Sequence, residues 1–137
     1  MHHTQQLLIQ KKALRRLNNG TSIIDVIRAA EMIIKGFEKG LYPRTAIKAK
    51  HAKLLFDNDH LNQGILGSIG RGLAELERQR VLVKVGGSLK SGLKYMLNCP
   101  LQCRDDGSIC GYFGTDRCPI IKLKILLALL GDGSDGL

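Results

Sequence analysis

The sequence has no run of about 18 or more apolar residues, the length that predicts a transmembrane helix. Its first residues also lack a basic stretch followed by an apolar stretch, so we expect no secretory signal. These two absences lead us to expect an intracellular protein, cytoplasmic or associated with the nucleoid, without membrane contact.

The common catalytic motifs are absent as well. There is no phosphate-binding loop, no hydrolase nucleophile motif and no zinc-peptidase motif. The 12 Asp and Glu residues are scattered, and the histidines do not cluster with them; His51 and His60 are expected on the surface. We therefore expect no enzyme activity and no catalytic residue.

The chain has far fewer acidic than basic residues. It carries 21 Lys and Arg against 12 Asp and Glu, a net charge of +9. Residues 1–98 hold 17 basic and 7 acidic residues, whereas residues from 99 onward hold 4 and 5. A polyanion is the natural partner of such a segment, with nucleic acid first and an acidic membrane surface second.

Cysteine is missing from the first 98 residues, and all four cysteines follow within 20 residues: Cys99, Cys103, Cys110 and Cys118. Without a secretory signal, clustered thiols favour a metal site over a disulfide framework. Four thiolates suit a tetrahedral zinc ion, our first expectation, and equally an iron–sulfur cluster, the alternative. Free or disulfide-paired thiols are the third possibility.

Apolar periodicity predicts four helices before residue 80. They span Thr4–Leu17, Ile23–Lys39, Arg44 or Thr45 to Leu55, and His60–Gln79. Thr21 or Ser22 is expected to cap the second helix and Gly40 to follow it, while Asn58 or Asp59 is expected to cap the fourth. The expected core stripe of the second helix is Ile23, Ile27, Ala30, Ile34 and Phe37.

Two strands are predicted after the fourth helix. Val81–Val85 alternates with period two, Gly86–Gly92 reads as a loop, and Leu93–Leu97 reads as a return strand, so the pair forms a hairpin. The segment from Ser22 to Asn98, with the passage LAELERQRVLVKV…GLKYML, resembles the winged helix-turn-helix superfamily of DNA-binding proteins. The resemblance implies a mainly α fold with a β-hairpin wing that binds double-stranded DNA in transcriptional or replication control.

The fourth helix would read the DNA. With Ile69 at the core, Ile65, Gly72, Leu73 and Leu76 point inward, and the outward residues are Gln63, Gly64, Gly67, Gly70, Arg71, Ala74 and Arg78. Exposed glycines cost a helix roughly 1 kcal/mol each, which favours close approach of a DNA groove or of another helix. Asn62 and Gln63 suit adenine, and Arg71 suits guanine. The expected phosphate contacts are Arg78, Arg80, Lys84, Lys90 and Lys94 at the helix end and wing, and Lys48, Lys50 and Lys53 on the third helix.

Two alternatives stay open for this domain. In the first, it is a protein-interaction module that binds a polymerase or replication subunit, and the glycine face only packs against a helix. In the second, it is an iron–sulfur regulator. A salt-dependent affinity for duplex DNA separates the first alternative from DNA binding.

The expected organisation is a basic N-terminal helix (1–20), the winged-helix domain (21–98), a four-cysteine segment with a terminal helix (99–130) and a disordered tail (131–137). Ile120–Leu130 reads as a helix buried nearly all round except at Lys122 and Lys124. It packs on the core or forms a dimer interface, and a homodimer through the N-terminal or C-terminal helix is one expected partnership.

Overall fold

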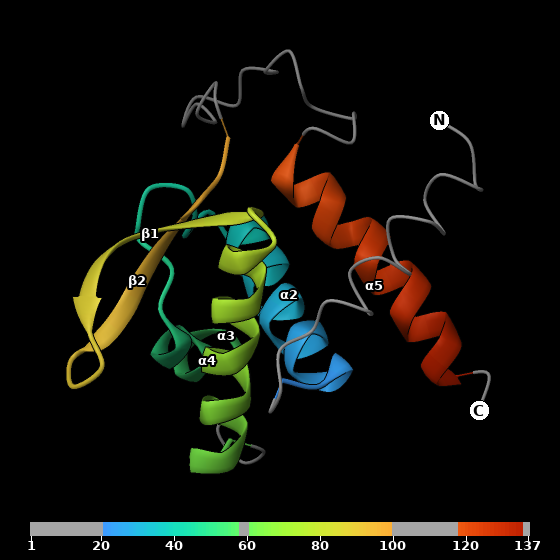
Figure 1. Ribbon diagram of the computed structural model, residues 1–137, viewed down its shortest axis with the longest axis horizontal. Helices are drawn as coiled ribbons and strands as arrows, with labels where there is room; N and C mark the ends of the chain where they lie inside the picture. Colours follow the sequence, from blue (N-terminus) through green and yellow to red (C-terminus); the bar gives the residue numbers. More distant parts are fainter. Residues whose placement is uncertain (1–20, 58–60, 100–117, 136–137) are drawn as a thin grey trace.

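The computed structural model describes residues 21–57, 61–99 and 118–135. In chain order its elements are α2 (Ile23–Glu38), the 3-10 helix η1 (Ala49–His51), α3 (Ala52–Leu55), α4 (Gln63–Arg78), β1 (Leu82–Ser88), β2 (Gly92–Leu97) and α5 (Pro119–Asp135). The hairpin and α5 lie on opposite sides of the α2–α4 pair (Figure 1). The predicted mainly helical chain with a hairpin after the helices is confirmed, and this order is compatible with a winged-helix-like arrangement. The helix predicted over Thr4–Leu17 lies outside the described residues.

Helix α2 begins with a capping box. The Ser22 hydroxyl accepts from the Asp25 backbone N–H at 3.4 Å, and the Asp25 carboxylate accepts from the Ser22 backbone N–H at 3.1 Å. Gly40 follows the helix with φ +81°, a conformation that glycine adopts without strain. The predicted cap and end of this helix are therefore confirmed.

The predicted core stripe of α2 is displaced. Ile23 is 41% exposed, and Ile27, Ile34 and Phe37 are only half-buried. The buried side is instead formed by Asp25, Val26, Ala29, Ala30, Met32, Ile33 and Gly36. The reason is that α2 packs against both α4 and α5, so the arc that is buried is set by two neighbours and includes a carboxylate.

The third predicted helix, from Arg44 or Thr45 to Leu55, is wrong over its first half. Ile47 forms an isolated antiparallel bridge with Tyr95 of β2, with N–O distances of 2.7 and 3.0 Å between their backbones. Lys48 is also extended, with φ −134° and ψ 147°. Helical structure begins only at Ala49, because the backbone groups of Ile47 are bonded across to the hairpin.

The fourth helix begins three residues later than predicted. Asn62 caps it, since its Oδ1 accepts from the Ile65 backbone N–H at 2.9 Å. The predicted caps Asn58 and Asp59, and His60 with them, lie outside the described residues. Of the predicted inward positions, Ile69, Gly72, Leu73 and Leu76 are buried, while Ile65 is half-buried against the core.

The hairpin is confirmed, but its strands are longer and its loop shorter than predicted. β1 runs through Gly86 and Gly87 to Ser88, and only residues 89–91 turn before β2 begins at Gly92. Lys84 pairs with Tyr95 and Gly86 with Lys94, so Val85 is an extra residue in β1. Such a bulge bends and twists the strand that carries it.

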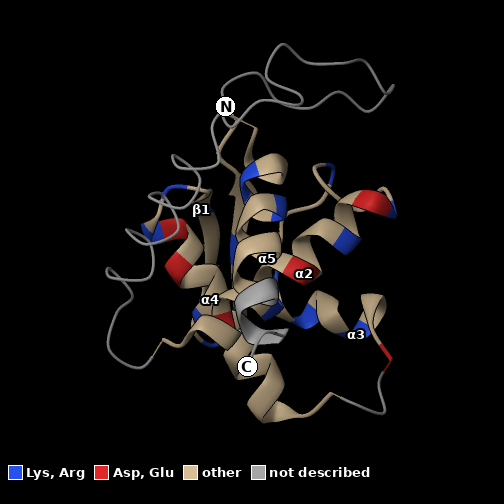
Figure 2. Cartoon of the chain, turned by 90° about the vertical axis from the view of Figure 1, so that its right-hand side faces the viewer, with Lys and Arg blue, Asp and Glu red and all other residues tan. Residues whose placement is uncertain are grey.

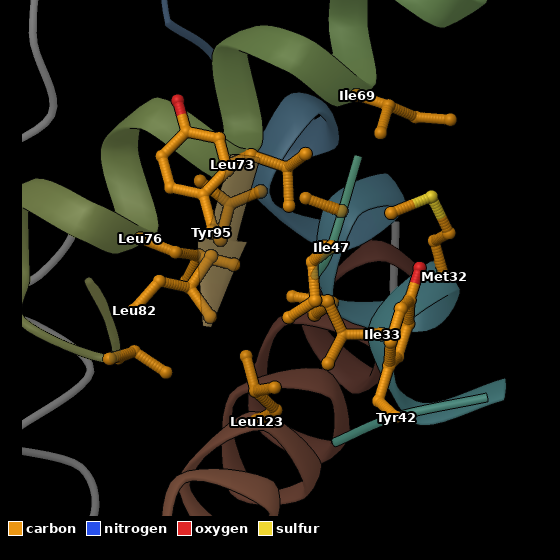
Figure 3. Close-up of a cluster of buried hydrophobic side chains, with 14 of the residues drawn as sticks. Met32, Ile33, Tyr42, Ile47, Ile69, Leu73, Leu76, Leu82, Tyr95 and Leu123 are labelled. Atoms are coloured by element: carbon orange, nitrogen blue, oxygen red, sulfur yellow. The ribbon is translucent and has the colours of Figure 1, made fainter. Parts of the chain in front are cut away.

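The core lies between the helices and the base of the hairpin. Leu73 and Leu76 of α4 meet Leu82 of β1 and Tyr95 of β2, and Leu123 of α5 points into the same cluster (Figure 3). Ile47 lies among them, which explains why the bridge forms there.

Helix α5 was expected to be buried nearly all round, which is wrong. Ile120, Leu123 and Leu130 are buried, but Ala128 is exposed and most of the other apolar residues are half-buried. One side of α5 packs on α2, so the helix packs on the core, which was one of the two alternatives predicted for it. The helix also continues to Asp135 through the predicted tail, because extending a formed helix adds a hydrogen bond for each residue.

Of the described helices, none has the length and apolar character to cross a membrane.

Candidate nucleic-acid interface

The outward face of α4 carries the glycines that the sequence places there. Gly64 and Gly67 are exposed, and a Cβ atom at Gly70 would have no neighbour within 4 Å. Gly72 differs, because a Cβ atom there would overlap the Asp25 carbonyl oxygen of α2. The four glycines therefore serve two purposes: Gly72 admits α2, whereas the other three leave a low, open surface.

Arg71 lies at the edge of this open surface. Its Nε donates to Asp25 Oδ2 at 3.2 Å, and its side chain remains 53% exposed. A Cβ atom at Gly67 would lie 3.5 Å from Arg71 Nη1, so the guanidinium lies over the preceding turn of α4. The Nη atoms thus border the glycine surface, while Nε is bonded to Asp25 of α2.

Asp25 is the buried group that holds Arg71. It is 3% exposed and also accepts from the Ser68 hydroxyl, which in turn accepts from Arg28 Nη1 at 3.1 Å. Burial alone would raise the pKa of Asp25, but the hydrogen bonds from Ser68 and the Ser22 backbone, together with Arg71, lower it below its usual value. The carboxylate is therefore ionised and joins α2 to α4.

Arg78 was predicted as a phosphate contact, and it lies against Glu75. The Arg78 Nε and Nη2 atoms donate to the two carboxylate oxygens, and Gln79 Nε2 donates to the same carboxylate at 2.8 Å. Glu75 is 2% exposed, and its hydrogen bond is the main reason that the pKa of Arg78 is raised. A phosphate contact by Arg78 would have to be shared with this pair.

Asn62 and Gln63 lie at the first turn of α4 and are both exposed. Asn62 Oδ1 is the helix cap, so a two-bond contact to adenine would have to share that oxygen with the Ile65 N–H. The role of both residues in reading adenine stays a prediction.

Three lysines gather beside the hairpin. The antiparallel bridge between Ile47 and Tyr95 carries Lys48 to the position opposite Lys94, and Lys50 follows on η1. The pKa of Lys48 is lowered, chiefly by the charge of Lys50 and also by partial burial and the charge of Lys94. We call Lys48, Lys50 and Lys94 the lysine cluster. Like charges placed opposite each other destabilise a pair of strands, and a bound anion would relieve their repulsion.

The remaining predicted contacts are spread around this cluster. Lys53 is exposed on α3, and Lys84 and Lys90 are exposed on β1 and in the hairpin turn. Arg80 has φ 66° and its carbonyl accepts from Asn98 Nδ2 at 2.7 Å, so its backbone fixes the junction of α4 and β1. The predicted lysines thus occupy the hairpin and its neighbouring helical segment, while α5, which faces the viewer in Figure 2, has its described charges near one end.

His51 was expected on the surface and is instead buried. Its Nδ1 is 2.8 Å from the Tyr42 hydroxyl, behind the lysine cluster. Burial and the charges of Lys48 and Lys50 lower the pKa of His51. Burial also raises the pKa of Tyr42, so the hydroxyl stays protonated and can donate a hydrogen bond to Nδ1 of the neutral ring.

The four-cysteine site stays a prediction. Cys103 and Cys110 lie outside the described residues, while Cys99 and Cys118 are not joined by a disulfide and Cys118 is buried in the core. Within residues 21–57, 61–99 and 118–135, no group of three or more His, Cys, Asp and Glu side chains could hold a metal. Native mass spectrometry of protein purified under reducing conditions tests the zinc expectation and the iron–sulfur alternative.

Sequence reasoning missed Asp25, Ser68 and Glu75 as parts of this region. Each lies on a helix where a periodic pattern of apolar residues gives no reason to expect a buried polar group. The one available signal was the capping-box spacing of Ser22 and Asp25, which indicates a helix start and not the contact with Arg71.

We compared the chain with protein-family models, with curated proteins and with solved structures, and none of the three comparisons gave a match.

Proposed function

We propose that the protein binds double-stranded DNA through a winged-helix arrangement, with α4 at the major groove and the β1–β2 hairpin as the wing. The observation that carries the proposal is the lysine cluster, which joins a helical segment to the hairpin. Two chain segments far apart in sequence contribute its like charges, and a phosphate backbone is the partner that such a cluster fits. A role in transcriptional or replication control would follow from this binding.

The outward face of α4 fits the same partner. Gly64, Gly67 and Gly70 leave the middle of α4 without bulky side chains, and Arg71 borders them. An α-helix can enter the major groove, where an arginine can hydrogen-bond to guanine. Since Asp25 already holds Nε, Arg71 is oriented before DNA arrives, with its Nη atoms as the groups available to a base.

The test compares two pairs of lysines on opposite sides of the molecule. Lys48 and Lys94 belong to the cluster, whereas Lys122 and Lys124 are exposed on α5. Changing both members of a pair to Gln alters the net charge equally. Fluorescence anisotropy of a labelled duplex at several salt concentrations then gives the slope of log affinity against log salt.

We expect the Lys48→Gln, Lys94→Gln variant to bind more weakly and to lose about 0.9 from that slope for each phosphate contact removed. The Lys122→Gln, Lys124→Gln variant should keep the slope of the unchanged protein. Equal losses in both variants would mean that net charge alone attracts the DNA. A protein with no salt-dependent affinity for duplex would favour the protein-interaction alternative.

A further inference from the structure

The tip of the hairpin displays an apolar side chain to solvent. Leu89 is 92% exposed, more than any other exposed large hydrophobic residue in the described part of the chain. Residues 89–91 form the turn, so Leu89 stands at the end of the hairpin farthest from the core. Hairpin turns usually carry small polar residues or glycine, and a leucine this exposed buries almost no surface in the folded domain.

The turn holds this leucine in a defined place. The Ser88 hydroxyl accepts from the Ser91 backbone N–H at 3.0 Å and lies 2.9 Å from the Ser91 hydroxyl. Gly87 and Gly92 have φ +82° and +96°, and a Cβ atom at Gly87 would overlap the Gly92 carbonyl oxygen. The two strands therefore close tightly beneath the tip, and little conformational freedom remains to be lost when Leu89 meets a partner.

The surroundings of Leu89 are basic. From Arg78 to Cys99 the sequence has no acidic residue, and the hairpin bears Lys84 on β1, Lys90 at the tip and Lys94 on β2. Cations on both strands with one apolar side chain at the end match a DNA minor groove, whose two phosphate backbones lie on either side of its floor. An anionic membrane fits less well, because Ser88, Lys90 and Ser91 would leave a single apolar side chain to enter the lipid.

We infer that Leu89 is an apolar wedge, which the hairpin inserts between two stacked base pairs from the minor groove. Lys84, Lys90 and Lys94 contact the flanking phosphates, and the duplex bends away from the hairpin, toward its major groove. This inference rests on the proposed DNA binding and adds to it a deformation of the DNA. Wedges of this kind kink DNA by roughly 20–90°, and flexible pyrimidine–purine steps unstack most easily.

The experiment measures bending of a short duplex with one central TA step and a dye at each end. The full chain is compared with Leu89→Ser, with the conservative Leu89→Met and with Leu54→Ser, which changes another exposed leucine, 71% exposed on α3. Bound fraction is measured by anisotropy in the same samples. We expect the unchanged protein, Leu89→Met and Leu54→Ser to shorten the distance between the dyes, and Leu89→Ser to bind without shortening it.

Three results would overturn the wedge, and they are distinguishable. If Leu89→Ser bends the duplex as the unchanged protein does, the wedge is wrong and the proposed DNA binding stands. If the unchanged protein does not bind the duplex, both fail. The third result has two parts: the unchanged protein binds vesicles of phosphatidylcholine and phosphatidylserine, and Leu89→Ser loses vesicle binding but still bends the duplex. In that case the tip is a membrane contact.

Discussion

The two faces of α4 use similar residues in opposite ways. Toward α2, Gly72 and Ser68 are buried, and the nearby carboxylate of Asp25 is bonded to Ser68 and Arg71. On the outward side, a Cβ atom at Gly70 would meet nothing within 4 Å, and one at Gly67 would meet only Arg71 Nη1. A glycine of α4 therefore allows close packing where another helix lies against it, as at Gly72, and leaves an open surface where no other segment does, as at Gly70.

The largest effect that distinguishes the two faces should come from the glycines. Gly72→Ala forces a Cβ atom against the Asp25 backbone, so we expect it to lower the free energy of unfolding by about 3 kcal/mol, the upper end for overpacking. Gly70→Ala is the matched control, and it should raise stability by up to about 1 kcal/mol because nothing opposes the new methyl group. Urea unfolding measures both. Equal effects from the two changes would show that the faces do not differ.

The next effect concerns the carboxylate between the helices. Asp25→Ala removes the bonds to Ser22, Ser68 and Arg71, and we expect a loss of about 2 kcal/mol. Ser22→Ala removes only the cap hydroxyl and should cost about 1 kcal/mol. Thermal unfolding of both variants measures the difference. If Ser22→Ala is as damaging as Asp25→Ala, the link to α4 contributes no stability beyond the cap.

Arg71 is the residue that touches both faces, so its replacement sharpens the comparison. Arg71→Ala should weaken specific DNA binding by about 1 kcal/mol, the lower end for an arginine–base contact, because Asp25 already uses Nε. Its effect on unfolding should be smaller, since the side chain is half exposed. Anisotropy titrations with a preferred and an unrelated duplex provide the measurement. Equal weakening for both duplexes would assign Arg71 to the phosphate backbone.

The smallest effect is a pH dependence behind the lysine cluster. The pKa of His51 is lowered in the folded protein, so the unfolded chain binds the proton more readily. The stability from the neutral ring is complete above about pH 6.5, the ordinary histidine value, and is lost as the pH falls through the lowered pKa. When the pH is lowered from about 7.5 to about 5.5, the Tm of the unchanged protein should therefore fall by more than the Tm of His51→Gln. Thermal unfolding at both pH values measures the two changes. Asp25 contributes only at more acidic pH, because its pKa is also lowered.

The sequence predicted those parts of the fold that depend on local pattern. The spacing of apolar residues and the cap residues predict the start of α2 at Ile23 and most inward residues of α4, and alternation predicts the hairpin. The third helix failed because Ile47 finds its backbone partner in Tyr95, far along the chain, which no local window includes. The buried carboxylates Asp25 and Glu75 were missed because burial of a charge depends on partners that come together only in the folded molecule.

The candidate surface was predicted unevenly for the same reason. An outward position on α4 follows from helical phase, so Gly64, Gly67 and Arg71 were placed correctly. The closeness of Lys48 and Lys94 depends on the register of a bridge, and the burial of His51 depends on Tyr42. Helical phase was enough to arrange the outward residues of α4, whereas the buried side of α2 and the contacts of Lys48 and His51 depend on other elements.

The bridge between Ile47 and Tyr95 also has a consequence during synthesis. A growing chain carries Lys48 and Lys50 well before β2 exists, so it has two of the lysines but not the cluster. The third arrives only when Tyr95 has emerged and paired, a long-range closure that comes late because its loop entropy must be offset first. Under the proposed DNA binding, a nascent or half-folded chain has weak affinity for DNA, and tight binding requires that folding is complete.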